Sequence, residues 1–162
     1  MENRDYLRAA IASVLDAMRR GDEDETRDRV TSLIESGELT ARAAVWELAT
    51  ADASILRSSA DEAEKGIQVA LELCDPNGSA VEIDETEPSL RAAVRMLLAL
   101  VNGCPGDALA QQDLVTEQEP AEMALVFLHL AGWMLALLGL LDSVEHADAV
   151  VPGWLRHLSV GD

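Results

Sequence analysis

The side chains best suited to chemistry in this chain are its three histidines, and their neighbours fit no familiar metal site. His129 lies in an apolar stretch seven residues after Glu122, and His146 follows Asp142 by four residues. A di-iron site in a helical bundle needs two Glu-x-x-His elements and two further glutamates. Neither that element nor His-x-x-x-His occurs in the sequence. We therefore expect no metal site, and we interpret His129 as a core histidine.

The two cysteines and the remaining motifs give no sign of catalysis. Cys74 and Cys104 stand thirty residues apart, which is not a zinc spacing. No Gly-x-Ser-x-Gly elbow, glycine-rich phosphate loop or dinucleotide fingerprint is present. The first residues lack the apolar segment of a signal peptide, so we expect a cytoplasmic protein without disulfides, whose cysteines are buried or free thiols. The sequence predicts a non-enzyme without a cofactor.

The acidic residues are the most unusual feature of the composition. There are 30 Asp and Glu against 12 Lys and Arg, for a formal net charge of −18. DNA- and RNA-binding surfaces need Lys and Arg to displace phosphate counterions, and anionic membranes repel acidic surfaces. We therefore expect neither direct nucleic-acid binding nor membrane contact. The acids either keep the chain soluble or dock a basic partner.

Two acidic clusters are candidates for holding a cation. One is Asp22, Glu23, Asp24 and Glu25, and the other lies within 82–87. An EF-hand loop requires acids at alternate positions, a central glycine and a terminal glutamate, and neither cluster has them. We therefore expect a solvated surface with no bound cation, and residues 22–25 are a possible acidic docking face.

The elements that must position these residues are helices. Apolar residues recur every three or four positions, as on the buried face of a helix, while aromatic residues make up only 3% and no period-two run suggests a strand. The sequence predicts an all-α bundle of seven to nine helices. The expected helices cover 5–20, 24–35, 40–58, 61–74, 89–102, 107–117 and 120–141, and a last segment is divided by Pro152 and Gly153.

The helix at 120–141 differs from the others. Residues 123–141 contain no charged side chain, and this uncharged segment is near the length of a helix that spans a bilayer. Its flanks are acidic and lack the Lys and Arg that anchor a spanning helix, so we expect a water-soluble protein. The helix is either the core of a monomer or part of a homodimer interface. The large side chains expected in such an interface are Phe127, Trp133, Met134 and Trp154.

The two halves of the chain resemble each other. Residues 7–11 (LRAAI) recur as 90–94 (LRAAV), Gly21-Asp22 recurs as Gly106-Asp107, and Leu48-Ala49 recurs as Leu130-Ala131. The offsets run from 82 to 85 residues. We interpret this as an internal duplication within one helical domain, with halves 1–74 and 89–162 joined by an acidic linker at 75–88. The 34-residue pattern of tetratricopeptide repeats is absent.

These features predict a cytosolic interaction or regulatory module, with a protein partner that could be basic and with a second copy of itself. The chain contains eleven Arg and one Lys, a ratio that is typical of proteins from a GC-rich bacterial genome. The binding surface is expected in the groove between the halves or on the acidic face. The first alternative is an acidic nucleic-acid mimic or immunity-type protein that neutralises a basic partner. The second is a helical ligand-binding protein or enzyme.

Overall fold

A computed structural model describes residues 2–61, 73–142 and 150–159 of the chain. These residues contain seven α-helices and no strand, so the expected all-α fold is confirmed, with a helix number at the lower edge of the expected range. A single antiparallel bridge joins Cys74 to Ala80. The elements are α1 (Glu2–Arg19), α2 (Glu23–Glu35), α3 (Glu38–Asp61), the 3-10 turn η1 (Ile83–Glu85), α4 (Pro88–Val101), α5 (Pro105–Thr116), α6 (Pro120–Leu141), the 3-10 turn η2 (Gly153–Leu155) and α8 (Arg156–Ser159).

Local sequence signals set where most of these helices begin. Helices α4, α5 and α6 each start with proline, whose fixed φ suits the first helical position and whose missing N–H would have no partner there. Helix α2 is capped instead by the Asp22 carboxylate, which accepts a hydrogen bond from the Glu25 backbone N–H at 3.0 Å. Positive φ angles at glycines, among them Gly21 and Gly103, reverse the chain between helices.

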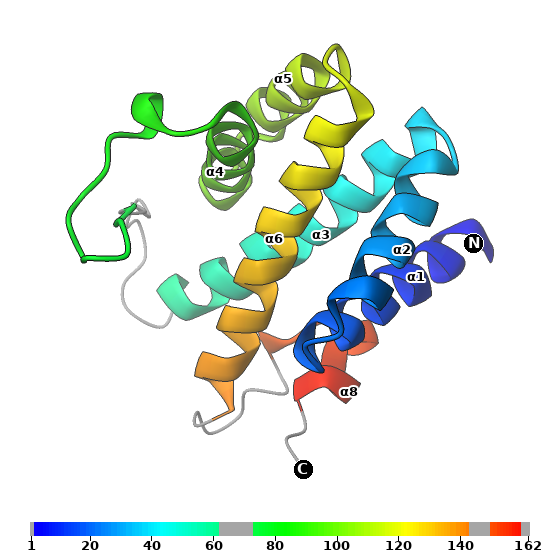
Figure 1. The fold of residues 1–162 in the computed structure, drawn as a ribbon. Helices are drawn as coiled ribbons and strands as arrows, with labels where there is room; N and C mark the ends of the chain where they lie inside the picture. Colours follow the sequence, from blue (N-terminus) through cyan, green and yellow to red (C-terminus); the bar gives the residue numbers. More distant parts are fainter. Residues whose placement is uncertain (1, 62–72, 143–149, 160–162) are drawn as a thin grey trace.

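Two central helices organise the fold. Helices α3 and α6 cross in the middle of the molecule, with α1 and α2 on one side and α4 and α5 on the other (Figure 1). Helix α6 is therefore central, as its apolar composition indicates. The short C-terminal elements η2 and α8 pack on α1 and α6. The core extends through all six long helices, and Phe127, Ile11 and Leu15 are among its largest fully buried side chains.

Among the described residues, three long helices precede the connection to α4 and three long helices follow it. Helices of 18, 13 and 24 residues are followed, after the connection, by helices of 14, 12 and 22 residues. The turns between the first two helices of each half also agree, since Gly21 has φ 72° and Gly103, 82 residues later, has φ 74°. The backbone hydrogen bonds of the first turn recur at this offset. The N–H groups of Gly21, Asp22 and Thr26 donate to the carbonyl oxygens of Met18, Ala17 and Asp22, respectively. In the second turn, the N–H groups of Gly103, Cys104 and Ala108 donate to the carbonyl oxygens of Leu100, Ala99 and Cys104.

The buried positions of the central helices agree at the same offset. Six buried residues of α3 have buried counterparts in α6, each 82 residues further along the chain. The pairs are Ala41 and Met123, Ala44 and Val126, Val45 and Phe127, Leu48 and Leu130, Ala49 and Ala131, and Asp52 and Met134. Five pairs join apolar residues, and the sixth places a carboxylic acid opposite a methionine.

Several expected boundaries differ from those in the structure. Asp61, expected to cap a fourth helix, is instead the last residue of α3, and most of that predicted helix lies outside the described residues. The expected linker at 75–88 is partly fixed to α4. Arg91 Nη2 donates hydrogen bonds to the carbonyl oxygens of Asp84 (2.9 Å) and Thr86 (2.8 Å), and Arg95 Nη2 lies 2.6 Å from Asp84 Oδ1. The acidic segment before α4 therefore follows the helix surface rather than standing free of it.

Candidate interaction surface

The acidic run proposed as a docking face is largely occupied by internal contacts. Asp22 caps α2, and Glu25 accepts hydrogen bonds from both Arg20 and Arg29, which lowers the pKa of its carboxyl group. Asp24 pairs with Arg27 at 3.0 Å. Of the four acids, Glu23 is the exposed residue without such a partner. The run therefore presents less uncompensated negative charge than its sequence indicates.

Most arginines of the described part of the chain are engaged in the same way. Arg4 and Arg8 both bind Glu47, at 2.6 and 3.0 Å. Arg42 binds Asp113 at 2.5 Å, across the boundary between the halves. Because the few cations are held in internal pairs, the remaining acids dominate the outer charge of the molecule.

The side chains proposed as interface anchors lie in or against the core of the single chain. Phe127 and Met134 are fully buried within the single chain, where they form part of its core. Trp133 is half-buried and stacks on His129, with ring centroids 6.3 Å apart. Trp154 lies under the Arg8 guanidinium, whose carbon is 5.7 Å from the ring centroid. An interface on α6 would have to use other residues.

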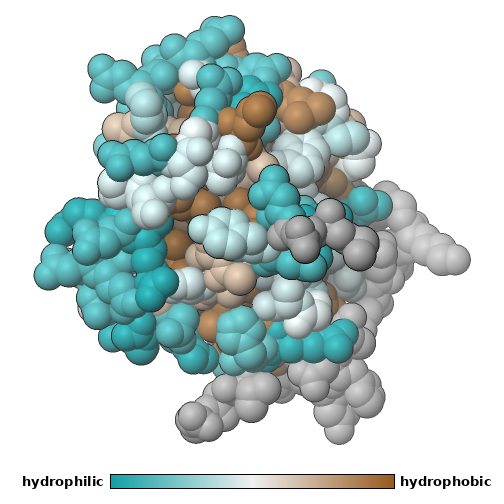
Figure 2. Space-filling view, turned by 90° about the vertical axis from the view of Figure 1, so that its right-hand side faces the viewer, coloured by the Kyte–Doolittle hydropathy of each residue, from teal (hydrophilic) through white to brown (hydrophobic). Residues whose placement is uncertain are grey.

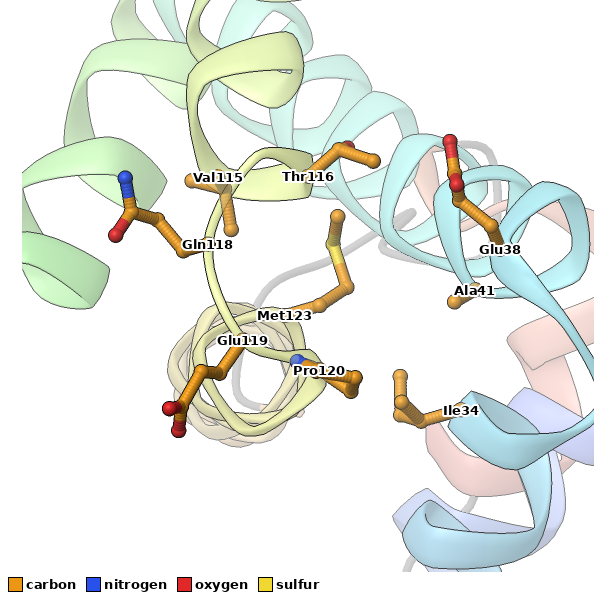
Figure 3. Close-up of a pocket in the computed structure, with 9 residues that line it drawn as sticks. All are labelled: Ile34, Glu38, Ala41, Val115, Thr116, Gln118, Glu119, Pro120 and Met123. Atoms are coloured by element: carbon orange, nitrogen blue, oxygen red, sulfur yellow. The ribbon is translucent and has the colours of Figure 1, made fainter.

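A pocket lies where the two halves meet. It has a volume of about 150 Å³ and lies between the α2–α3 turn of the first half and the α5–α6 turn of the second. Its side chains surround the space from both turns, with apolar groups facing the centre and the carboxylates of Glu38 and Glu119 at its edges (Figure 3). We call it the junction pocket; it is lined by Ile34, Glu38, Ala41, Val115, Thr116, Gln118, Glu119, Pro120 and Met123.

Hydrogen bonds between α3 and α5 fix one wall of the junction pocket. Arg42 Nη1 donates to Thr116 Oγ1 at 3.0 Å, and Arg42 Nη2 lies 2.5 Å from Asp113 Oδ1. The buried Gln112 amide donates to the Arg42 carbonyl oxygen at 2.7 Å. The position of Thr116 relative to Ala41 is therefore set by three polar contacts, and the pocket is a preformed feature of the fold.

The edge of the junction pocket is acidic. Glu38 and Glu119 line it, and Glu35, Glu117 and Glu122 are chain neighbours of lining residues. The structure gives none of these five acids an ion pair with a described residue. The one arginine close by, Arg42, is already neutralised by Asp113. The pocket thus combines an apolar floor with uncompensated negative charge.

Larger, more open hollows occur elsewhere on the described surface. One of about 520 Å³ lies between the α1–α2 turn and α6, with Met18, Val30 and Leu128 among its apolar residues. Its acids Asp22 and Glu23 are accompanied by Arg27, so it is less acidic than the junction pocket. Figure 2 shows that the side of the molecule bearing α1 and α2 is mostly hydrophilic, with apolar side chains visible between hydrophilic ones.

The titratable groups of the interior do not assemble into a catalytic group. Asp52 is fully buried, neither carboxyl oxygen has a hydrogen-bond partner, and burial raises its pKa well above the ordinary value. His129 is half-buried; burial lowers its pKa, and the Glu87 charge opposes that shift. No cluster of three His, Cys, Asp or Glu able to hold a metal ion occurs in the described segments. Cys74 and Cys104 are free and exposed, so the expectation that they could be buried hydrophobes is wrong.

The sequence could not locate the junction pocket, because its lining comes from two turns about eighty residues apart. The signal that pointed nearest to it was the resemblance between the halves, whose turns meet there. Helix α6 is long and apolar enough to cross a membrane, which for one such helix is weak evidence, and the structure packs one side of it in the core. Neither protein-family models, curated proteins nor solved structures give a significant match to the chain.

Proposed function

We propose that this protein is a non-catalytic interaction module that binds a basic, amphipathic segment of a partner protein at the junction pocket. The observation that carries the proposal is the apolar pocket edged by unpaired carboxylates, in a chain whose arginines are largely held in internal pairs. A cytoplasmic location in a bacterium remains the expectation from the sequence. The partner's apolar side chain would enter the pocket, while its Lys or Arg residues lie over Glu38 and Glu119.

The size of the junction pocket supports recognition of one side chain. Pockets for drug-sized ligands and cofactors measure roughly 300 to 1,000 Å³. At about 150 Å³ the junction pocket is smaller than that range. Protein interfaces, in contrast, derive much of their energy from a few side chains that fill small, desolvated pockets. A protein partner therefore suits this space better than a small-molecule substrate.

The charges at the edge would provide selectivity and speed of association. Carboxylates around an apolar pocket attract a positively charged segment and oppose an acidic one. The contribution of exposed charges falls as ionic strength rises, because the Debye length shortens to about 10 Å at 0.1 M salt. Binding through the junction pocket should therefore weaken with salt without disappearing, since burial of the apolar side chain remains.

The alternatives predict different results. An acidic nucleic-acid mimic would bind through spread charge, so its complex would be lost at high salt and be insensitive to the shape of the pocket. A helical ligand-binding protein would use a hollow of ligand size, such as the open one of about 520 Å³ beside Met18 and Leu128, rather than the junction pocket. An enzyme would need reactive side chains in such a hollow, and neither the unpartnered Asp52 nor the half-buried His129 lines it.

The test uses a helical peptide with leucine on one face and lysine on the other, titrated into the purified protein at low and moderate salt. Ala41→Met fills the pocket with the side chain found at the equivalent position 123 and should weaken binding about tenfold, the effect of losing one anchor residue. Glu38→Gln with Glu119→Gln should weaken binding and flatten its salt dependence. The matched control, Glu23→Gln with Asp28→Asn, also removes two exposed negative charges, away from the pocket.

The same variants then serve as baits for proteins from the native host. A partner retained by wild type and by the control pair, but lost by Ala41→Met, supports the proposal. Equal loss with either acidic pair and no effect of Ala41→Met would instead favour the acidic mimic. Thermal melts of each variant establish that the fold is intact.

We also propose that the two halves derive from one three-helix unit by duplication at a constant offset of 82 residues. The repeated helix order, the matching turn hydrogen bonds and the paired buried positions support this. The turn glycine equivalent to Gly21 is then Gly103, whereas Gly106 belongs to α5. On this proposal the junction pocket lies where equivalent turns of the two units meet.

A further inference from the structure

The outer face of α6 is apolar, and the described residues 2–61, 73–142 and 150–159 leave part of it exposed. Only 39% of the residues in its most apolar 18-residue window are buried. Leu125 is 41% exposed, and Gly132, Ala136 and Gly139 are also exposed on this side of the helix. The buried side chains of α6, Phe127 and Met134 among them, occupy the opposite side. The most apolar helix of the chain therefore keeps a strip of exposed apolar residues on the side opposite the core.

The residues on this face have the spacing of a helix-to-helix seam. Alternating steps of four and three residues place side chains along one line of a helix that packs against a second helix. The seam is defined here as Ala121, Leu125, Leu128, Gly132, Leu135 and Gly139, which follow those steps without interruption. Ala121, Leu125, Gly132 and Gly139 are exposed and Leu128 and Leu135 are half-buried.

The pattern along the seam is complementary to its own reverse. Gly132 lies midway between Leu125 and Gly139, seven residues from each, with Leu128 and Leu135 on either side. Further out, Leu125 at one end faces Gly139 at the other when a second α6 is laid antiparallel. Two copies related by a twofold axis at Gly132 thus place a large side chain opposite a glycine at each end, which is the self-complementarity that an isologous interface requires.

The glycines on this face have no explanation within one chain. Glycine in the middle of a helix is unfavourable relative to alanine. A Cβ added at Gly132 or Gly139 would meet nothing within 4 Å, and neither residue has a positive φ. The packing of the monomer therefore does not require glycine at either position, whereas close approach of another helix would.

Charge selects the occupant of the seam. The chain carries a net charge of −18, so two copies repel each other over most of their surfaces. Between Met123 and Leu141 no charged residue occurs, so the helix itself brings no charge into contact with a second copy. A basic partner finds no carboxylate on the seam, and the acids that flank it, Glu122 and Asp142, disfavour an anionic lipid surface.

We propose that the chain forms an antiparallel homodimer through the α6 seam, centred on Gly132. A helix of 22 residues is about 33 Å long and 10 Å wide, so the contact buries roughly 300 to 400 Å² on each copy, below the area of about 800 Å² that a stable interface buries per partner. The dimer is therefore concentration-dependent. It does not rest on the junction pocket, because Met123, which lines that pocket, faces away from the seam.

The experiment measures mass by sedimentation equilibrium across a wide range of protein concentration, for wild type and three variants. Gly132→Glu adds a side chain where the monomer has open space and places two like charges at the twofold axis. Its dimer dissociation constant should rise by about tenfold or more, as for loss of a central interface residue. Gly132→Leu tests shape without charge and should also weaken the dimer. Ala110→Glu, on the exposed face of α5, adds the same charge elsewhere and should leave the dimer unchanged.

Three outcomes would overturn the proposal. The first is a mass of a single chain for wild type at every concentration. The second is a dimer that Gly132→Glu leaves intact. The third is a wild-type protein that stays monomeric in solution but binds vesicles of neutral phosphatidylcholine, with the binding abolished by Gly132→Glu. That result would assign the exposed face of α6 to a lipid surface. Circular dichroism melts should show that both Gly132 variants keep the wild-type fold. The peptide titration of the junction pocket should be unaffected by Gly132→Glu, so that failure of either proposal is recognised separately.

Discussion

Asp52 is the residue whose chemistry departs furthest from its surroundings. It lies on the buried side of α3, at the position equivalent to Met134 of α6, and none of its carboxyl oxygens is hydrogen-bonded. A buried polar group without a partner costs stability, since it gives up its hydration and gains nothing in return. Burial raises the pKa of Asp52, and no nearby charge contributes to the shift. The apolar environment therefore favours the neutral form of the carboxyl group.

The sign of the pH dependence follows from this raised pKa. Below the ordinary pKa of about 3.8, Asp52 is protonated in both the folded and the unfolded chain and has no effect on the pH dependence. Above that value the unfolded chain ionises while the folded chain stays neutral, so stability falls as pH rises until the folded-state pKa is reached. Asp52→Asn should abolish this part of the pH dependence. Urea unfolding of wild type and Asp52→Asn at several values between about pH 5 and pH 8 measures this difference in the pH dependence of stability.

Replacing Asp52 with an apolar residue should go further. Asp52→Leu keeps the forked shape at Cγ and removes the unpartnered oxygens, so it should stabilise the protein at neutral pH by about 1 to 3 kcal/mol. The gain is to be measured from the midpoint of urea unfolding at constant m-value. Asn at this position serves as the control, because it removes the ionisable group but keeps a buried polar one. A loss of stability with Leu would mean that the site is too tightly packed for the added volume, or that Asp52 has a partner in solution.

Little in the sequence pattern predicts a buried acid at this position. Asp52 reads as a polar interruption of an otherwise amphipathic helix, and only the crossing of α3 with α6 determines that it faces inward. The same limit applies to the junction pocket, which depends on the angle at which two turns meet. Phe127 and Met134 illustrate the reverse case. Their size suggested interface anchors, but in a helix that is apolar all round the sequence does not distinguish the core side from the outer side.

At the level of the elements, the sequence predicted the helices well because their ends carry chemical signals. Proline at the first helical position and glycine after the last turn fixed most boundaries to within a few residues. The proposed repeat was harder to align. Sequence identity paired Gly21 with Gly106 and gave an offset that varied from 82 to 85 residues, whereas the similar backbone angles of Gly21 and Gly103 favour a constant offset of 82. Alanine- and leucine-rich helices match one another in several registers, and burial is needed to choose between them.

The turn glycines provide a test of this register. Gly21 and Gly103 have left-handed φ angles of 72° and 74°, and a Cβ at either position would meet nothing within 4 Å. Gly21→Ala and Gly103→Ala should therefore each destabilise the fold by about 1 to 2 kcal/mol through backbone strain alone. Gly106→Ala, within α5, should be neutral or stabilise by up to about 1 kcal/mol. Thermal melts of the three variants measure this, and similar effects at Gly21 and Gly106 would contradict the proposed register.

At the scale of the whole molecule, opposing electrostatic effects act on stability. Exposed ion pairs such as those of Arg27 and Arg29 contribute little to stability, because solvent screens them. The excess of 18 negative charges acts against them, because folding brings the unpaired acids closer together than in the extended chain. Since acids outnumber bases by more than two to one, we expect repulsion to outweigh the pairs.

Moderate salt should therefore stabilise this protein. Screening shortens the reach of the charge to about 10 Å at 0.1 M, which removes repulsion between distant acids more than attraction within pairs in contact. The melting temperature at pH 7.5 should rise as sodium chloride is added, and the rise should shrink toward the isoelectric point near 4.3, where no net charge remains to be screened. Measuring this in Asp52→Asn keeps the ionisation of the buried acid out of the comparison. A melting temperature that falls with salt would show instead that the internal arginine pairs outweigh the repulsion between acids. The acids at the edge of the junction pocket would then repel one another less than the net charge implies.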